Sequence, residues 1–183
     1  MFKISYRIIT ESDYWKKLEP EQIEREGGIS GFFQMRFCTE EYGYYHERDL
    51  ASGEEGFDII STWLDNLLWV CKSIHIADYT ALKDIESYNT WIEFVRKGDY
   101  LAVSMMESDE LITEYLVTCP PSNRTYPQWK DVLVSRDEFQ NEVLEVTESF
   151  IREAATLNAF LPHCTRFKKM AQLLNEIKGH IGR

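Results

Sequence analysis

Apolar and polar side chains alternate with a period of two at the start of the chain. The apolar positions of this first segment are Phe2, Ile4, Tyr6 and Ile8. Successive side chains of a strand point to opposite faces, so the pattern predicts a strand with one buried face. Residues 29–38 repeat the pattern through Phe33, Met35 and Phe37, which predicts a second strand.

The pattern changes to a helical period between residues 58 and 75. Apolar residues recur there at intervals of three or four: Ile60, Trp63, Leu64, Leu67, Cys71 and Ile74. Asp58 precedes them in the position of an N-cap, so we expect the helix to begin directly after it. Cys71 lies on the apolar face, so we expect its thiol to pack in the core.

Strand patterns return between residues 79 and 118. Two alternating runs flank the dipeptide Lys97-Gly98, which is typical of a tight hairpin turn. The hairpin should bring five apolar side chains to one face: Ile92, Phe94, Leu101, Val103 and Met105. Residues 79–86 and 111–118 alternate as well, so this part of the chain is predicted to form three or four strands.

Helical patterns follow the proline-rich segment 119–129. Ser135 and Glu138 have the spacing of a capping box, which predicts the start of a helix that ends at Pro162. One face of this helix carries Phe139, Val143, Val146, Phe150, Ala154, Leu157 and Leu161. A last amphipathic helix is expected from the apolar positions between Phe167 and Ile177.

These elements predict an α+β fold, with one antiparallel sheet of about five to six strands and three main helices packed mostly on one face. The length is typical of a single domain, residues 1–183. Within it we expect a sheet with one long helix in residues 1–118. A proline-rich connector should follow in residues 119–129, and the C-terminal helices in residues 130–183.

The 31 acidic and 20 basic residues give the chain a net charge of −11. This charge repels phosphates and anionic membranes, so we expect no direct binding of nucleic acid or membrane, whereas a basic protein would be attracted. The last 21 residues are the exception, with one acidic residue and five basic ones: Arg166, Lys168, Lys169, Lys178 and Arg183. That tail is too short and too mixed to predict a nucleic-acid-binding arm.

The N-terminal residues lack the features of a signal peptide, and no apolar run approaches the roughly 20 residues that span a bilayer. The four cysteines are widely spaced and form no CxxC pair: Cys38, Cys71, Cys119 and Cys164. We therefore expect a cytoplasmic, bacterial-type protein whose thiols are reduced and mostly buried.

Residue types used in catalysis and metal binding are present, but not in recognised arrangements. The candidate metal ligands are two groups without a known ligand spacing, His46 with Glu47 and Asp49, and His75 with Asp78. The glycine-rich segment 27–31 leads into a strand rather than a helix, which favours a turn over a phosphate-binding loop. We therefore expect no catalytic residue, no metal and no cofactor.

Glu93 is the one carboxylate with an unusual sequence position. It shares a strand face with Trp91 and Val95. Burial of that face would raise its pKa and make acid–base chemistry conceivable. A sheet face open to solvent is the simpler expectation.

The stretch EEYGYYHERDLASGEEGFD, residues 40–58, has neither a helical nor a strand period and combines seven carboxylates with three tyrosines. Tyrosines bury a large area with little loss of side-chain freedom, and surrounding carboxylates would steer a basic partner. The alternative is a solvated acidic loop without a partner. A binding surface would include Tyr42, Tyr44, Tyr45, Glu47, Asp49, Glu54 and Glu55, joined by Glu107, Asp109 and Glu110 from a second acidic turn.

Three segments resemble small bacterial immunity proteins of polymorphic and contact-dependent toxin systems: GFDIISTWLDNLL, NTWIEFVRKGDYLAVS and DVLVSRDEFQNEVLEV. The size and acidity of the chain agree with that resemblance. It implies a non-catalytic protein that binds a cognate toxin domain, often a basic nuclease, and blocks its active site or substrate groove. It assigns no role to an individual residue.

Two other functions stay open on the sequence. A scaffold or self-associating subunit of a cytosolic assembly would use the aromatic residues for self-association. An enzyme with an unfamiliar carboxylate-based site would need a pocket with converging polar groups. The sequence does not fix the oligomeric state, and a monomer is the simpler expectation.

Overall fold

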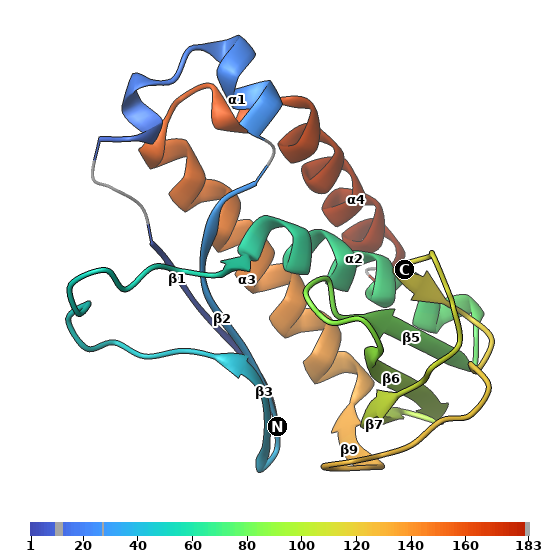
Figure 1. Cartoon of the computed structure of the whole chain (residues 1–183). Helices are drawn as coiled ribbons and strands as arrows, with labels where there is room; N and C mark the ends of the chain where they lie inside the picture. Colours follow the sequence, from blue (N-terminus) through green and yellow to red (C-terminus); the bar gives the residue numbers. More distant parts are fainter. Residues whose placement is uncertain (10–12, 27, 182–183) are drawn as a thin grey trace. The chain divides into compact units, whose positions relative to one another are not determined.

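The computed structural model describes residues 1–9, 13–26 and 28–181, and it has the α+β fold that the sequence predicts. Gly27 and Arg183, which the sequence patterns include, lie outside the described residues. The antiparallel strands form two sheets where one was expected (Figure 1).

The strands are β1 (Phe2–Ile8), β2 (Ser30–Phe37), β3 (Glu40–Tyr44), β4 (Asp58–Ile59), β5 (Tyr79–Lys83), β6 (Thr90–Lys97), β7 (Tyr100–Glu107), β8 (Leu116–Val117) and β9 (Val132–Ser135). The α-helices are α1 (Pro20–Glu26), α2 (Ile60–Ile76), α3 (Arg136–Leu157) and α4 (Thr165–Ile181), with 3-10 turns at Trp15–Lys17 and Leu161–His163.

The chain forms two compact units, each assembled from three separate stretches. Unit 1 comprises Met1–Lys3, Arg36–Glu41 and Trp69–Glu142. Unit 2 comprises Ile4–Met35, Tyr42–Leu68 and Val143–Arg183. The helices α2 and α3 contribute residues to both units. The expectation of a single domain concerns independent folding, and it stays a prediction.

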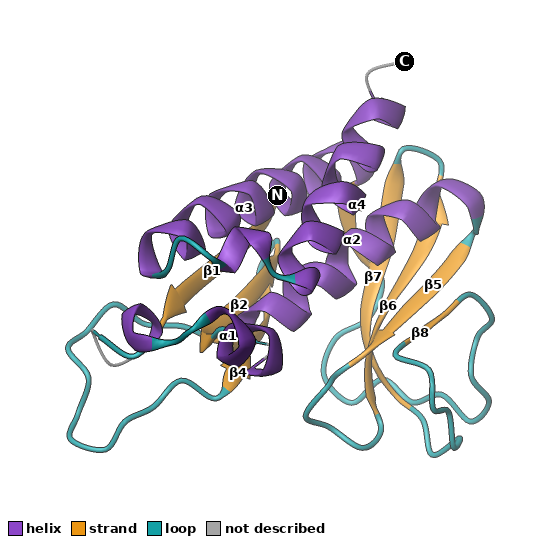
Figure 2. Cartoon of the chain, turned by 90° about the horizontal axis from the view of Figure 1, so that it is seen from above, coloured by secondary structure: helices purple, strands orange, loops and turns teal. Residues whose placement is uncertain are grey.

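Unit 1 contains the five-stranded sheet, in the order β8-β5-β6-β7-β9. Figure 2 shows β5, β6 and β7 side by side. The predicted hairpin between β6 and β7 is confirmed, and its turn residue Gly98 has a φ of +63°. Ile92 pairs with Met105 and Phe94 with Val103, so the apolar side chains share a face as the alternation predicts.

That face of the sheet carries an aromatic core within unit 1. The ring of Phe94 lies 5.2 Å from that of Phe139 in the first turns of α3, and Phe139 lies 4.8 Å from Phe2. Phe37 lies 4.9 Å from Phe2, and all four rings are buried. Burial of each ring contributes about 1.5–3 kcal/mol to stability. The start of α3 is as predicted, since the Glu138 amide donates to Ser135 Oγ at 3.4 Å.

The segment 108–131 covers the opposite face of this sheet. Trp91 and Met106 are buried there, with Ile112 and Tyr126 packed against them. The predicted strand 111–118 is wrong for most of its length, because Ile112 packs on the face of the sheet and only Leu116–Val117 pairs with β5. The strand β9 was expected to belong to the helical part, but it pairs with β7.

The other sheet has the order β1-β2-β3, and β4 also pairs with β2. The stretch 40–58 was expected to be irregular throughout, but its first five residues form β3. The cause is tertiary, because β2 offers backbone partners and Tyr42 packs on Trp63 of α2, with ring centroids 5.9 Å apart.

The helix α2 begins at Ile60, so the prediction that Asp58 is its N-cap is wrong. Asp58 lies in β4 opposite Gly31, and this pairing holds its backbone in an extended conformation. Its carboxylate accepts a hydrogen bond from Trp63 Nε1 at 3.1 Å. Further along α2, Cys71 is buried as predicted, and burial raises the pKa of its thiol.

Two of the four cysteines, Cys71 and Cys164, are buried. Cys38 and Cys119 are exposed, so the expectation of mostly buried thiols is wrong for these two. Both exposed cysteines lie outside the helices and strands, Cys38 in the turn between β2 and β3 and Cys119 in the proline-rich connector.

The helix α3 ends at Leu157, earlier than the predicted end at Pro162. Asn158 terminates it, because its Nδ2 donates to the Trp15 carbonyl oxygen at 2.7 Å and its Oδ1 accepts from the Phe160 amide at 2.9 Å. The last amphipathic helix is confirmed as α4.

Candidate partner-binding surface

Residues 45–57 connect β3 to β4 within unit 2 and are called the β3–β4 loop here (Figure 1). Both flanking strands pair with β2, so the loop connects two neighbours of the same strand. At its return, a Cβ atom on Gly56 would lie 2.3 Å from the Cα atom of Gly31 in β2. Only glycine fits this approach, which holds the end of the loop against the sheet.

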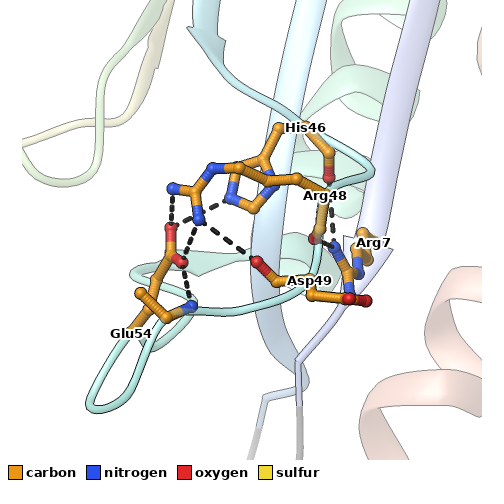
Figure 3. Close-up of polar contacts among 6 residues, drawn as sticks. Arg7, His46, Arg48, Asp49 and Glu54 are labelled. Atoms are coloured by element: carbon orange, nitrogen blue, oxygen red, sulfur yellow. Dashed lines mark hydrogen bonds and ion pairs between the residues drawn. The ribbon is translucent and has the colours of Figure 1, made fainter.

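Glu54 is the centre of a hydrogen-bond network in the loop (Figure 3). Its two carboxylate oxygens accept hydrogen bonds from Nη1 and Nη2 of Arg48, at 2.7 and 2.6 Å. The Ala51 amide donates to the same carboxylate at 2.8 Å, and Nε2 of His46 lies 3.0 Å from it. This network ties both halves of the loop together, and its bidentate pair is the strongest kind of charge-assisted contact.

The donors around Glu54 stabilise its ionised form. The Arg48 hydrogen bond, followed by that of the Ala51 amide, lowers the pKa of Glu54 from 4.5 to about 2. Only 18% of the Glu54 side chain is exposed, compared with 54% of Arg48. Glu54 therefore organises the loop and does not present its charge to a partner.

Arg7 of β1 holds a second part of the loop (Figure 3). Its Nη1 donates to the carbonyl oxygen of Arg48 at 2.7 Å and to that of His46 at 3.3 Å. These carbonyl groups lie in irregular backbone, where no ladder hydrogen bond satisfies them. The β3–β4 loop thus has a defined internal structure, unlike a simple solvated loop.

Four rings gather where the loop meets the sheet. Phe32 of β2 is buried, and its ring lies 5.6 Å from Tyr44, 4.5 Å from His46 and 6.1 Å from Phe57. Tyr44 is the last residue of β3 and Phe57 the last residue of the loop, and their rings stack at 6.1 Å, with 24° between their planes. Because 43% of Tyr44 and 55% of Phe57 stay exposed, the pair presents a supported aromatic surface to solvent.

Exposed carboxylates lie in the same loop as this aromatic pair. We call the exposed set the acidic–aromatic surface, and it consists of Tyr44, Glu47, Asp49, Leu50, Glu55 and Phe57. Large apolar side chains that stay exposed next to polar ones are typical of protein-binding surfaces.

The residues that the sequence predicts for partner binding fall into several environments. Tyr42 is half-buried against Trp63, and the half-buried Tyr45 donates its hydroxyl hydrogen to Glu47 at 3.1 Å. Glu54 is internal to the loop. The predicted residues that remain in the acidic–aromatic surface are Tyr44, Glu47, Asp49 and Glu55.

The second acidic cluster, Glu107, Asp109 and Glu110, belongs to unit 1 and is described there by itself. Glu107 ends β7, and its backbone pairs with Thr125. The Glu110 carboxylate accepts a hydrogen bond from the Ser122 amide. Two members of the cluster therefore fasten the segment 108–131, and Asp109 is exposed.

Several residues that shape the loop and its candidate surface carry little or no sequence signal. Leu50 and Phe57 belong to no apolar period, so only the structure marks them as exposed. Arg48 is the one Lys or Arg among seven carboxylates in residues 40–58, and that isolation is a signal of ion pairing. Arg7 has no such signal, because its strand is far from the loop in sequence.

Glu93 of unit 1 overturns the expectation of a solvent-open sheet face, because only 2% of its surface is exposed. Arg124 Nη1 donates to Glu93 Oε1 at 3.0 Å, and the Tyr126 hydroxyl lies 3.3 and 3.2 Å from its two oxygens. Burial, followed by the charge of Glu93, raises the pKa of Tyr126, which keeps that hydroxyl protonated. The Glu93 carboxylate therefore already accepts hydrogen bonds from Arg124 and Tyr126, as in a structural ion pair.

Among the described residues, no group of three His, Cys, Asp or Glu side chains could hold a metal ion. Within residues 1–9, 13–26 and 28–181, no helix combines the length and apolar character that crossing a bilayer requires. Comparisons of the chain with protein-family models, curated proteins and solved structures give no match. Its function is therefore argued from the surface itself.

Proposed function

We propose that the chain is a cytoplasmic, non-catalytic immunity protein that binds a cognate toxin domain with a basic, nuclease-like surface. The observation that carries the proposal is the β3–β4 loop, which is held by Arg7 and Glu54 while it exposes an aromatic pair among carboxylates. The resemblance of three segments to immunity proteins supplies the class of partner.

Preorganisation is the first argument for binding. A loop that is already hydrogen-bonded loses little conformational freedom when a partner docks, so more of the contact energy appears as affinity. The stacked pair of Tyr44 and Phe57 is a suitable anchor, because aromatic side chains dominate the energetics of many interfaces.

Charge is the second argument, and it selects the partner. The exposed residues Glu47, Asp49 and Glu55 lie between Tyr44 and Phe57 in the sequence, and the whole chain carries −11. A protein groove that attracts phosphates also attracts carboxylates, so a basic nuclease-like domain matches this surface. Such complementarity raises the association rate and makes it sensitive to salt.

The first test captures partners with the full chain as bait from its source cytoplasm, with washes at about 50 mM and about 500 mM salt. Support requires a basic protein at one-to-one stoichiometry whose toxic or nuclease activity disappears when the chain is added. The proposal fails if the bait returns alone or bound only to itself. It also fails if the captured protein keeps its activity in the complex.

The second test assigns the surface with charge-reversal variants of the captured complex. We expect the double variant Glu47→Lys with Glu55→Lys to slow association about tenfold or more at low salt. The matched control is Glu21→Lys with Glu145→Lys, which makes the same change of net charge on exposed residues of α1 and α3. Equal rates for the two double variants would remove the β3–β4 loop from the interface.

A further inference from the structure

A cavity of about 490 Å³ lies in unit 2, and no residue of the acidic–aromatic surface lines it. Its apolar lining includes Trp15, Ile29, Leu161 and Phe167. These side chains are buried, so the walls are fixed by the fold. The volume is within the range of sites for small organic ligands.

Charged side chains of both signs line the same cavity. Asp65 comes from α2, and Arg166 and Lys169 come from α4. Asp65 is half-buried and makes no hydrogen bond among the described residues, although it interacts electrostatically with both cations. Burial raises the pKa of Asp65 more than the two cations lower it.

The basic side of the cavity has contacts that leave its charge available. Arg166 donates through Nη1 to two neutral acceptors, Ser61 Oγ at 3.2 Å and Thr62 Oγ1 at 2.9 Å. These hydroxyls orient the guanidinium without neutralising it. Lys169 is exposed, so the lining combines two positive charges, one available carboxylate and several apolar side chains.

The fourth charged residue of the lining, Glu24, is already committed. Its Oε1 accepts hydrogen bonds from the Thr165 amide at 2.9 Å and from the Thr165 hydroxyl at 3.4 Å. It therefore caps the first turn of α4, where a negative charge also meets the positive end of the helix. Asp65 is thus the carboxylate of the lining that a ligand can use.

We infer that this cavity binds a small zwitterion with an apolar body, namely an apolar α-amino acid. Its carboxylate would bind between Arg166 and Lys169, its ammonium group would bind Asp65, and its side chain would lie against Trp15 and Phe167. A simple anion would leave Asp65 unpaired at the edge of the site, and a simple cation would face Arg166 and Lys169.

This inference uses no residue of the β3–β4 loop, so it stands or fails independently of the proposed function. The wild-type chain is titrated with L-phenylalanine, L-leucine and L-methionine up to ~10 mM, by calorimetry and by NMR of the Trp15 indole. We expect at least one of these amino acids to bind and to shift the Trp15 resonance. Absence of binding by all three would overturn the inference.

Two analogues test the zwitterion directly, since 3-phenylpropanoate lacks the ammonium group and 2-phenylethylamine lacks the carboxylate. Each should bind about tenfold or more weakly than L-phenylalanine, because each loses a charge-assisted contact. Equal or tighter binding of 3-phenylpropanoate would make this an anion site and overturn the inference.

Variants of Asp65 and Lys169 test which group of the ligand each side chain contacts. Asp65→Asn should remove the preference for L-phenylalanine over 3-phenylpropanoate. Lys169→Gln should weaken L-phenylalanine and strengthen 2-phenylethylamine, which no longer meets that positive charge, whereas Lys168→Gln, an exposed neighbour outside the lining, should change neither. A preference that survives Asp65→Asn, or equal effects of Lys168→Gln and Lys169→Gln, would contradict the assigned contacts.

Discussion

Glu93 depends for its burial on residues far from it in the sequence. Its hydrogen-bond partners Arg124 and Tyr126 come from the proline-rich connector, which the sequence marks only as an interruption of regular structure. The connector is therefore part of the core of unit 1. Its Arg124 supplies the positive charge that compensates the buried Glu93 carboxylate. Its Tyr126 packs against the cluster that contains Trp91 and Met106.

Removing the positive partner should leave Glu93 buried with its charge uncompensated. We expect Arg124→Ala to lower the free energy of unfolding by about 2–3 kcal/mol, less than a fully buried pair because 35% of the Arg124 side chain is exposed. Chemical denaturation at pH 7 measures this change.

Two controls separate the ion pair from loss of packing. Lys130→Ala removes a cation that lies 4.2 Å above the Tyr126 ring, and it should cost about 1 kcal/mol or less. Adding Glu93→Gln to Arg124→Ala should restore part of the lost stability, because the buried charge is then gone. A double variant less stable than Arg124→Ala alone would refute this account.

The β3–β4 loop behaves as an element of its own because one carboxylate organises it. Glu54 has a lower pKa in the folded loop, about 2, than its ordinary value of 4.5. It therefore stabilises the folded loop fully above pH 4.5, and this contribution is lost as the pH falls from 4.5 to about 2.

Acid should therefore open the loop before the hairpin of unit 1. The Ala51 amide reports this directly, since it donates to Glu54. Between about pH 6 and about pH 2.5, its protection against hydrogen exchange should fall, while the Phe94 amide in β6 stays protected. In Glu54→Gln the Ala51 amide should exchange faster at pH 6 and lose its acid dependence. Constant protection in the wild type would contradict the role of Glu54.

Regular elements were predictable where local pattern and tertiary packing agree. The β6–β7 hairpin has a glycine turn and two matching apolar faces, and α4 has one continuous apolar stripe, so both follow from the sequence. The strand β3 and the position of Asp58 did not follow, because pairing with β2 decides both. The exposed carboxylates of the candidate surface were predictable, but the inward position of Glu54 depends on Arg48 and the Ala51 amide.

At the scale of the whole molecule, the number of sheets was not predictable from the sequence. Alternation shows that a segment is a strand, but not which neighbour it pairs with. The strand β2 joins β1, β3 and β4 in one sheet, whereas β5 to β9 form the other. Some of these pairings, such as β2 with β4 and β7 with β9, join segments far apart in the chain, so no local signal records them.

The net charge of −11 sets how the whole chain responds to salt. Surface ion pairs such as Lys178–Glu148, at 2.8 Å, weaken in salt, but their contributions are small. Self-repulsion among the excess carboxylates weakens as well, and it opposes folding. We expect the second effect to dominate.

Raising sodium chloride from about 20 mM to about 300 mM at pH 7 should increase the free energy of unfolding by about 0.5 kcal/mol or more. Thermal and urea unfolding measure it. The Glu21→Lys and Glu145→Lys double variant, which has less excess negative charge, should gain less from salt than the wild type. A salt-induced loss of stability in the wild type would mean that local ion pairs outweigh self-repulsion.

The β3–β4 loop connects two strands that both pair with β2, and this has an evolutionary consequence. Substitutions at the exposed positions 47, 49, 50 and 55 change the side chains of the surface while β3 and β4 keep their pairing with β2. The proposed recognition can therefore diverge between descendants of this chain without a new fold. A library that randomises Glu47, Asp49, Leu50 and Glu55 while it preserves Arg7, Arg48 and Glu54 would sample that diversity in the laboratory.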